Sequence, residues 1–296
     1  SLESIYYQGD IASWCGISGL DKLMESGRTL YINGEELSGE LVIPDGVTAI
    51  PAMAFYCCDL ITSVTISDDV TEIDSSAFSG CTSLESITIP DSMTSIGFLA
   101  FSGCDSLESI YYQGDIASWC GISGLDKLME SGRTLYINGE ELSGELVIPD
   151  GVTAIPAMAF YCCDLITSVT ISDDVTEIGS SAFYGCSSIE SVTIGNGVTV
   201  IPVMAFHGCG LITSIIIPDS VTFIGDYAFN GCGSLDVVFY GGTESDWGNM
   251  DIGSRNAYLT DATRYYYSEN QPTEEGNFWH YDTTGVTPVI WTKETT

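Results

Sequence analysis

The stretch SLESITIPDSMTSIGFLAFSGCD, residues 83–105, carries the pattern that decides the fold. Leu84, Ile87 and Ile89 place apolar side chains on one face of an extended segment. Ser86 and Thr88 fall on the opposite face, and this alternation is typical of a half-buried strand. The stretch therefore begins with a short strand that must bury one face.

The remainder of the stretch predicts a return path that closes a thin coil. Pro90 ends the strand because proline donates no ladder hydrogen bond. Met93 and Ile96 form a second short inward-facing segment, and Phe101 supplies most of the core. Residues 98–103 are too few for more than one or two helical turns. A single coil cannot bury its apolar face, so we expect coils to stack, and each buried Phe or Ile contributes roughly 1.5–3 kcal/mol.

The pattern recurs along the chain with a step of 23 residues. Its Ala-Phe dipeptide stands at Ala54-Phe55, Ala77-Phe78, Ala100-Phe101, Ala159-Phe160, Ala182-Phe183, Ala205-Phe206 and Ala228-Phe229. A longer period of 105 residues is superimposed, because residues 1–73 recur unchanged as residues 106–178. This longer unit holds three 23-residue coils and one 36-residue coil that carries an insertion. Periods of 20–50 residues are typical of solenoids.

The coil also resembles a known family of repeats. Its strand half, Leu84-x-x-Ile87-x-Ile89, matches a leucine-rich repeat, although the usual Asn column is replaced, here by Ser92. The longer motif from Ile217 to Cys232, with its Ile-Pro-Asp and Ala-Phe-x-x-Cys elements, resembles the BspA-like leucine-rich-repeat family of bacterial surface proteins. The resemblance is dense over about residues 37–105 and 142–240.

Repeat and resemblance together predict an α/β repeat fold. We expect a leucine-rich-repeat solenoid over residues 1–240, with a parallel sheet on one face and short helices or 3₁₀ turns on the other. Its tandem duplication comprises residues 1–105 and 106–210, with inserted coils near 8–36 and 113–141. Residues 241–296 are expected to form a C-terminal capping segment, because solenoids need a cap over the last coil.

Composition excludes several classes of partner. The formal net charge is -34, with only 7 Lys and Arg residues, so nucleic acid and anionic lipid surfaces are disfavoured. No stretch approaches the roughly 20 apolar residues that membrane insertion requires. An acidic surface suits an exported protein that stays soluble by self-repulsion. The chain opens within the repeat pattern, without an initiator Met, which indicates a mature protein or an excised fragment.

Cysteine follows each Ala-Phe dipeptide three residues later and forms a column of the repeat. Its members are Cys58, Cys81, Cys104, Cys163, Cys186, Cys209 and Cys232. Neighbours in such a column lie about 4.8 Å apart, within disulfide reach, so geometry alone leaves pairing open. We favour buried free thiols, since Cys fills a small core position well. Cys15, Cys57, Cys120 and Cys162 lie outside the column, and their state is left open.

Enzymatic and metal sites have little support in the sequence. His207 stands at a position that varies among the coils, and His280 lies in the tail, so no catalytic triad is indicated. We therefore expect no enzyme activity and no cofactor. A column of acids offers oxygen ligands that could hold Ca²⁺, although turn capping explains it better. Its members are Asp45, Asp68, Asp91, Asp150, Asp173 and Asp219.

The outward positions of the strands provide the candidate ligand surface. Most are Ser or Thr, but Tyr111, Ile216 and Phe239 replace them with large apolar groups that could anchor a partner. Alternatively, the C-terminal cap covers these residues. The tail is rich in aromatic residues, among them Trp279 and Tyr281, which could stack on sugar rings or belong to the cap.

The resemblance implies a function in adhesion, because members of the BspA-like family are implicated in attachment to host or neighbouring cells. We accordingly expect a non-enzymatic extracellular or cell-surface protein whose partner is a protein or another cell-surface macromolecule. Two alternatives stay open. The chain could be a structural spacer within a larger surface protein, or a carbohydrate-binding module that uses the aromatic tail to bind a glycan.

Overall fold

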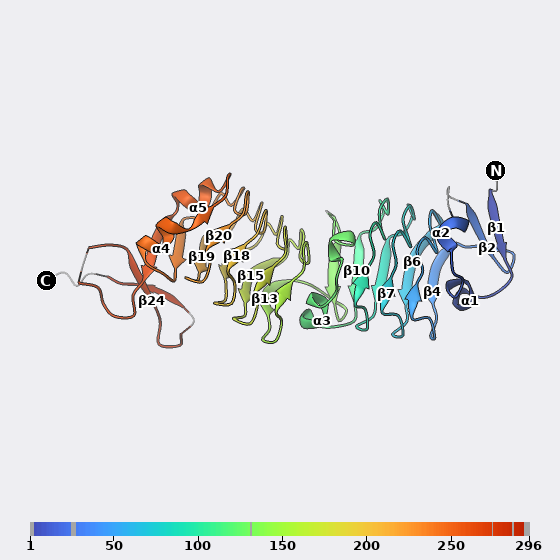
Figure 1. The fold of residues 1–296 in the computed structure, drawn as a ribbon, viewed down its shortest axis with the longest axis horizontal. Helices are drawn as coiled ribbons and strands as arrows, with labels where there is room; N and C mark the ends of the chain where they lie inside the picture. The colour runs from blue at the N-terminus through green and yellow to red at the C-terminus, as the bar shows by residue number, and fades with distance from the viewer. Residues whose placement is uncertain (1–2, 25–27, 131, 274, 286, 293–296) are drawn as a thin grey trace. The chain divides into compact units, whose positions relative to one another are not determined.

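The computed structural model describes residues 3–24, 28–130, 132–273, 275–285 and 287–292. The chain forms two compact units, Ser1–Leu142 and Ser143–Thr296, which are described separately. In both units short strands succeed one another along the chain and stack coil upon coil (Figure 1).

The first unit is built on a six-stranded sheet in the order β12-β11-β10-β8-β6-β4. Its strands are β4 (Gly39–Ile43), β6 (Ile61–Ile66), β8 (Ser86–Ile89), β10 (Ser109–Tyr112), β11 (Thr134–Ile137) and β12 (Glu140–Glu141). All neighbours are parallel except β11 and β12, which form an antiparallel hairpin. The parallel pairing places each residue opposite its counterpart in the next coil, so Val64 lies beside Ile87.

Smaller elements complete this unit. A three-stranded sheet contains β1 (Ser4–Tyr7), β2 (Thr29–Ile32) and β3 (Glu35–Glu36). Another contains β5 (Ala49–Ile50), β7 (Glu72–Ile73) and β9 (Ser95–Ile96). The helices are α1 (Ile11–Cys15), α2 (Leu20–Leu23), α3 (Ile116–Cys120) and the 3₁₀ helix η1 (Leu125–Lys127). All four belong to the inserted coils that the long period predicts.

The second unit is built on an eight-stranded sheet, in chain order, in which only β24 and β25 are antiparallel. Its strands are β13 (Gly144–Ile148), β15 (Ile166–Ile171), β17 (Ser191–Thr193), β19 (Ser214–Ile217), β21 (Val237–Tyr240), β23 (Thr263–Tyr267), β24 (Phe278–Tyr281) and β25 (Pro288–Ile290). The sheet thus continues beyond residue 240, and the expected boundary between solenoid and cap stays a prediction.

The return side of the second unit carries short paired strands and two helices. The strands are β14 (Ala154–Ile155), β16 (Glu177–Ile178), β18 (Val200–Ile201), β20 (Phe223–Ile224) and β22 (Asp251–Ile252). The helices are α4 (Glu244–Asn249) and α5 (Ala257–Asp261), both near the C-terminal end of the repeat array (Figure 1).

Stacked phenylalanines form the core between the strands and the return path. The rings of Phe78 and Phe101 lie 5.4 Å apart and nearly parallel, and those of Phe183 and Phe206 lie 5.2 Å apart. All of these rings are fully buried. The parallel sheet, the repeat and the short return elements confirm the predicted leucine-rich-repeat fold.

The return path of the 23-residue coils consists of turns rather than short helices. Successive turns are joined by backbone hydrogen bonds, such as Phe55 N–H to the Ala77 carbonyl at 2.8 Å and Phe78 N–H to the Ala100 carbonyl at 2.9 Å. Alternate amides therefore find their acceptors in the next coil, while those between them, such as Tyr56 N–H to the Met53 carbonyl at 3.1 Å, bond within their own turn. This cross-coil bonding explains why a segment of about six residues needs no helix of its own.

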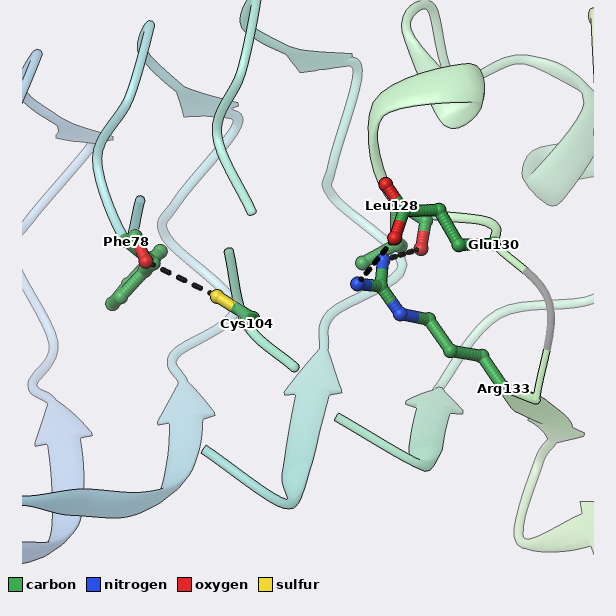
Figure 2. A network of polar contacts seen from close by, with 5 residues as sticks. All are labelled: Phe78, Cys104, Leu128, Glu130 and Arg133. Atoms are coloured by element: carbon green, nitrogen blue, oxygen red, sulfur yellow. Dashed lines mark hydrogen bonds and ion pairs between the residues drawn. The ribbon is translucent and has the colours of Figure 1, made fainter. Parts of the chain in front are cut away.

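The column cysteines are free thiols that take part in the stacking. Cys81 Sγ donates to the Phe55 carbonyl at 3.2 Å, and Cys104 Sγ to the Phe78 carbonyl at 3.1 Å (Figure 2). The second unit repeats the contact, for example from Cys186 to Phe160. Cys81, Cys104, Cys186, Cys209 and Cys232 thus each donate to a carbonyl of the preceding coil. Cys15 and Cys120 are buried free thiols in helices, while Cys57 and Cys162 are half-buried.

Candidate functional site

The outward face of the sheet in the first unit is a ladder of small hydroxyl side chains that ends in aromatic rings. Thr65, Thr88 and Tyr111 are successive partners across β6, β8 and β10. Tyr136 continues the same row on β11. The rings of Tyr111 and Tyr136 stack with centroids 4.6 Å apart, and Tyr111 is 37% exposed. Tyr111 therefore lies on the outward face of the sheet and is exposed to solvent, at the outward position that the strand pattern predicts.

The first inserted coil contains an equivalent pair. Tyr6 and Tyr31 also stack with centroids 4.6 Å apart, and Tyr6 is 67% exposed. Among the described residues their sheet consists of β1, β2 and β3, and no Ser/Thr ladder adjoins the pair there. The chain thus has two stacked tyrosine pairs in different surroundings, and of these four residues only Tyr111 was identified from the sequence.

A cavity of about 560 Å³ lies beside Tyr111 at the carboxyl ends of the strands. It is lined by Asp68, Thr88, Asp91, Tyr111, Tyr112, Gln113, Asn138 and Gly139. The lining follows from the topology, because Asp68, Asp91 and Gln113 come after β6, β8 and β10. In parallel strands these ends meet at one rim. The rim therefore joins two carboxylates to an exposed aromatic ring.

Two of the chain's few cationic side chains, Arg133 and Arg264, form hydrogen bonds within the protein. Arg133 is 5% exposed and donates to the Leu128 carbonyl and to Glu130, 3.0 Å away (Figure 2). Arg264 Nη1 donates to the Thr260 carbonyl at 2.7 Å. Burial lowers the pKa of Arg133, while Glu130 opposes that shift. These arginines satisfy carbonyl groups next to short helices, so they do little to offset the acidic surface.

In the second unit the corresponding outward residues are covered. Ile216 and Phe239 are only 7% and 8% exposed and pack against Trp279, which is 1% exposed. Ile216, Phe239 and Trp279 therefore do not form an exposed apolar patch. The C-terminal segment covers Ile216 and Phe239 instead, which is the alternative that the sequence left open. The physical reason is that β24 follows β23 in the sheet and brings Trp279 to within 5.5 Å of the Phe239 ring.

Polar contacts hold this cover in place. Trp279 Nε1 donates to the Tyr240 carbonyl at 2.8 Å, and Trp291 Nε1 donates to the Ser268 carbonyl at 2.9 Å. Tyr281 packs edge-on against Trp279 at 4.8 Å and is half-buried. Of the five candidate residues, Tyr111 stands apart in the first unit, and the other four come together in the second.

A second cavity, of about 790 Å³, lies between α4 and the strands β23 and β24. Its lining includes Arg264, Tyr266, Tyr267 and Phe278. The Arg264 guanidinium lies 5.1 Å from the centre of the Trp247 ring, which holds it at the cavity wall. Aromatic and polar groups are therefore both present in the tail.

Some of the acids at the strand ends accept backbone amides in turns, as the turn-capping interpretation predicts. Asp173 accepts the Asn196 amide at 2.7 Å, and Asp69, which follows the column residue Asp68, accepts the Gly46 amide at 2.7 Å, in each case across to a neighbouring coil. Within the described residues no group of three or more His, Cys, Asp or Glu side chains is arranged to hold a metal ion. The column thus joins coils at some positions and leaves other carboxylates without such a bond.

The histidines lie among aromatic rings. His207 stacks on Tyr184 at 4.6 Å, and Tyr184 stacks on Tyr161 at 4.8 Å. His280 lies 3.9 Å from the Trp291 ring. The ladder from Tyr161 to His207 was not identified from the sequence, although the 23-residue step aligns its three positions. In the first unit the same positions are Tyr56, Ser79 and Ser102, so the ladder belongs to the second copy.

These features define a leucine-rich-repeat protein whose outward strand residues are exposed at Tyr111 in one unit and covered at Ile216 and Phe239 in the other. The family model of the BspA type leucine rich repeat region matches residues 33–120 and 138–247 in 6 copies. The chain belongs to this family. None of the proteins of curated function matches the sequence.

Similar solved structures come from several bacteria. A leucine rich cell surface protein from Faecalibacterium prausnitzii is 28% identical, with a TM-score of 0.45, and the match covers 76% of this chain and 66% of that one. The chain therefore spans less than two thirds of that protein. The leucine rich repeat protein of T. pallidum is 26% identical, with 66% and 77% covered and a TM-score of 0.34. The pneumococcal vaccine antigen PcpA is 15% identical, with 80% and 79% covered and a TM-score of 0.41.

Family membership sets the broad class of function. Leucine-rich repeats generally mediate protein–protein interaction and are generally non-enzymatic. None of the helices in the described part of the chain has the length and apolar content needed to span a bilayer.

Proposed function

We propose that the protein is a non-enzymatic extracellular or cell-surface protein that mediates adhesion by binding another protein. Its contact surface is the outward sheet face of the first unit, with Tyr111 as the anchor. The observation that carries the proposal is the exposure of this stacked ring beside a cavity, while the matching face of the second unit is covered.

The physical properties of the face support this assignment. A rigid sheet presents Tyr111 at little cost in conformational entropy, and tyrosine is enriched among residues that dominate binding energy. The surrounding Ser and Thr side chains supply hydrogen-bonding groups without blocking the approach. The net charge of -34 favours partners with basic surfaces and disfavours nucleic acid.

A binding screen against immobilised host extracellular proteins tests the proposal, with the full chain and two variants. Tyr111→Ala is expected to weaken capture of a partner by at least about tenfold, as for a binding hot spot. Tyr6→Ala is the matched control, because it removes the same stacked ring where no ladder adjoins it. Equal effects of the two variants, or none of either, would reject Tyr111 as the anchor.

Carbohydrate binding is a second candidate function, favoured by the cavity that Tyr266, Tyr267 and Phe278 line. Tyr267 is 38% exposed and could stack on a sugar ring, whereas Trp279 is buried and could not. A glycan array probed with the full chain and with Tyr267→Ala tests this candidate. Binding that persists in Tyr267→Ala would exclude the cavity as its source.

A structural spacer is the remaining alternative. It requires no specific ligand, so capture of a partner that depends on Tyr111 would argue against it. Flanking domains in the full gene product would argue for it.

A further inference from the structure

We propose that the cavity beside Tyr111 binds a positively charged side chain, lysine or arginine, presented by a basic segment of a partner protein. The inference rests on the proposed function, because it names the chemistry that the sheet face would recognise. Two features of the cavity carry it: an open ring face and two carboxylates without a counter-charge.

The open ring face follows from the strand register. Tyr136 covers one side of the Tyr111 ring, with an angle of 25° between the ring planes. On the other side the register partner of Tyr111 is Thr88, whose side chain is far shorter than a phenol ring. One face of Tyr111 is therefore left open above Thr88. Cations bind such faces because the ring quadrupole is negative there.

The two carboxylates belong to Asp68 and Asp91, which end neighbouring strands and both line the cavity. Neighbouring strands lie about 4.8 Å apart, so the two acids stand one coil apart at the same rim. Neither accepts a hydrogen bond from another group in the part of the chain that the structure describes. Asp69 and Asp173, by contrast, bind amides of adjacent coils. Among the described residues of the lining there is no Lys, Arg or His.

The charge of the whole chain selects a protein cation over a metal ion. With a net charge of -34, the surface attracts basic segments and raises their rate of encounter. Two carboxylates provide fewer oxygens than the six to eight that Ca²⁺ takes. A guanidinium group can stack on Tyr111 and bind a carboxylate at once, which a metal ion does not do.

Calorimetric titration of the full chain with N-acetyl-arginine amide and N-acetyl-lysine amide tests the inference, with neutral N-acetyl-citrulline amide as the matched ligand. We expect saturable binding of a cationic compound and none of the citrulline compound. The double variant Asp68→Asn, Asp91→Asn is expected to weaken binding at least about tenfold, since it removes both charge-assisted contacts. The control Asp45→Asn, Asp150→Asn changes the charge equally within the same acid column, away from the cavity lining.

The outcomes separate this inference from the proposed function. Equal binding of citrulline, equal loss in both double variants, or no saturable binding of either cationic compound would overturn it. Ca²⁺ binding at Asp68 and Asp91 that excludes both compounds would also overturn it. If a partner is captured through Tyr111 but is insensitive to Asp68→Asn, Asp91→Asn, the inference fails and the function stands. If arginine binds as expected but no partner is captured, the cation site stands and the function fails.

Discussion

At the scale of single residues, cysteine shows how the repeat uses a reactive side chain for packing. Cys58 is buried at 6% exposure, and its neighbour in the column, Cys81, donates its thiol to the Phe55 carbonyl. Burial, with smaller contributions from Cys57 and Asp59, raises the pKa of Cys58 to about 12, from an ordinary value of 9.0. The folded state therefore holds the proton of Cys58 at pH values where the unfolded chain releases it.

The buried cysteine column is expected to make the free energy of unfolding decrease at alkaline pH. The folded pKa of Cys58 lies above the unfolded value, so its contribution is intact below pH 9.0 and is lost as pH rises toward about 12. At about pH 11 the loss is on the order of 2 kcal/mol for this thiol. We expect Cys58→Ala to reduce the loss of stability between pH 8 and pH 11, as measured by urea denaturation. A difference between variant and wild type that does not change with pH would contradict this account.

At the scale of elements, the inserted coils each close with a capped helix. Asp115 caps α3 by accepting the Ser118 amide at 2.8 Å, and Ser118 Oγ accepts the Asp115 amide at 3.0 Å. Behind the helix the Tyr112 and Trp119 rings lie 5.1 Å apart. A Cβ atom on Gly114 would lie 2.6 Å from the Tyr112 hydroxyl, so the glycine of the Tyr-x-Gly motif makes room for that ring.

Loss of the helix cap is expected to lower the stability of the fold by a measurable amount. Asp115→Ala removes the acceptor for the first turn of α3 and is expected to lower stability by about 1 kcal/mol, whereas Asp115→Asn keeps an N-cap acceptor and should cost less. The hydrogen bonds to Ser118 lower the pKa of Asp115, so the deficit of Asp115→Ala should disappear in acid as that carboxylate is protonated. Thermal denaturation at pH 7 and pH 2 measures both effects, and equal melting temperatures at pH 7 would show that the cap contributes nothing.

The sequence predicted the strands well because each coil repeats the same apolar spacing. Ile87 and Val64 are partners in the sheet, as the 23-residue step requires. The sequence alone could not show that Tyr111 is exposed and Phe239 buried, since both replace a Ser or Thr at outward positions. Phe239 is buried because Trp279, 40 residues further along the chain, packs against it, and the 23-residue period does not predict that contact. The cavity likewise depends on Asn138 at the end of the hairpin strand β11, outside the 23-residue pattern.

At the scale of the whole molecule, the two compact units have different outward faces, and their boundary after Leu142 does not coincide with the boundary between the two copies of the duplication. The copies are identical over residues 1–73 and 106–178, so differences in function arise from what adjoins them. In the first unit β10 follows the Ser/Thr ladder and leaves Tyr111 open. In the second unit the sheet runs into β23 and β24, which bury Phe239 and Trp279. The Tyr111 ring thus stays exposed on the outward face of the first unit, whereas Phe239 is covered in the second.

Blocking the open face tests the central claim most directly. Thr88→Trp places a bulky ring beside the free side of Tyr111, and Thr193→Trp makes the same change at the copied position of the second unit. The binding of a captured partner to wild type and to both variants is compared by surface plasmon resonance. We expect Thr88→Trp to abolish binding while Thr193→Trp leaves it unchanged. Unchanged binding by Thr88→Trp, or its loss in Thr193→Trp alone, would contradict the assignment of the interaction surface to the first unit.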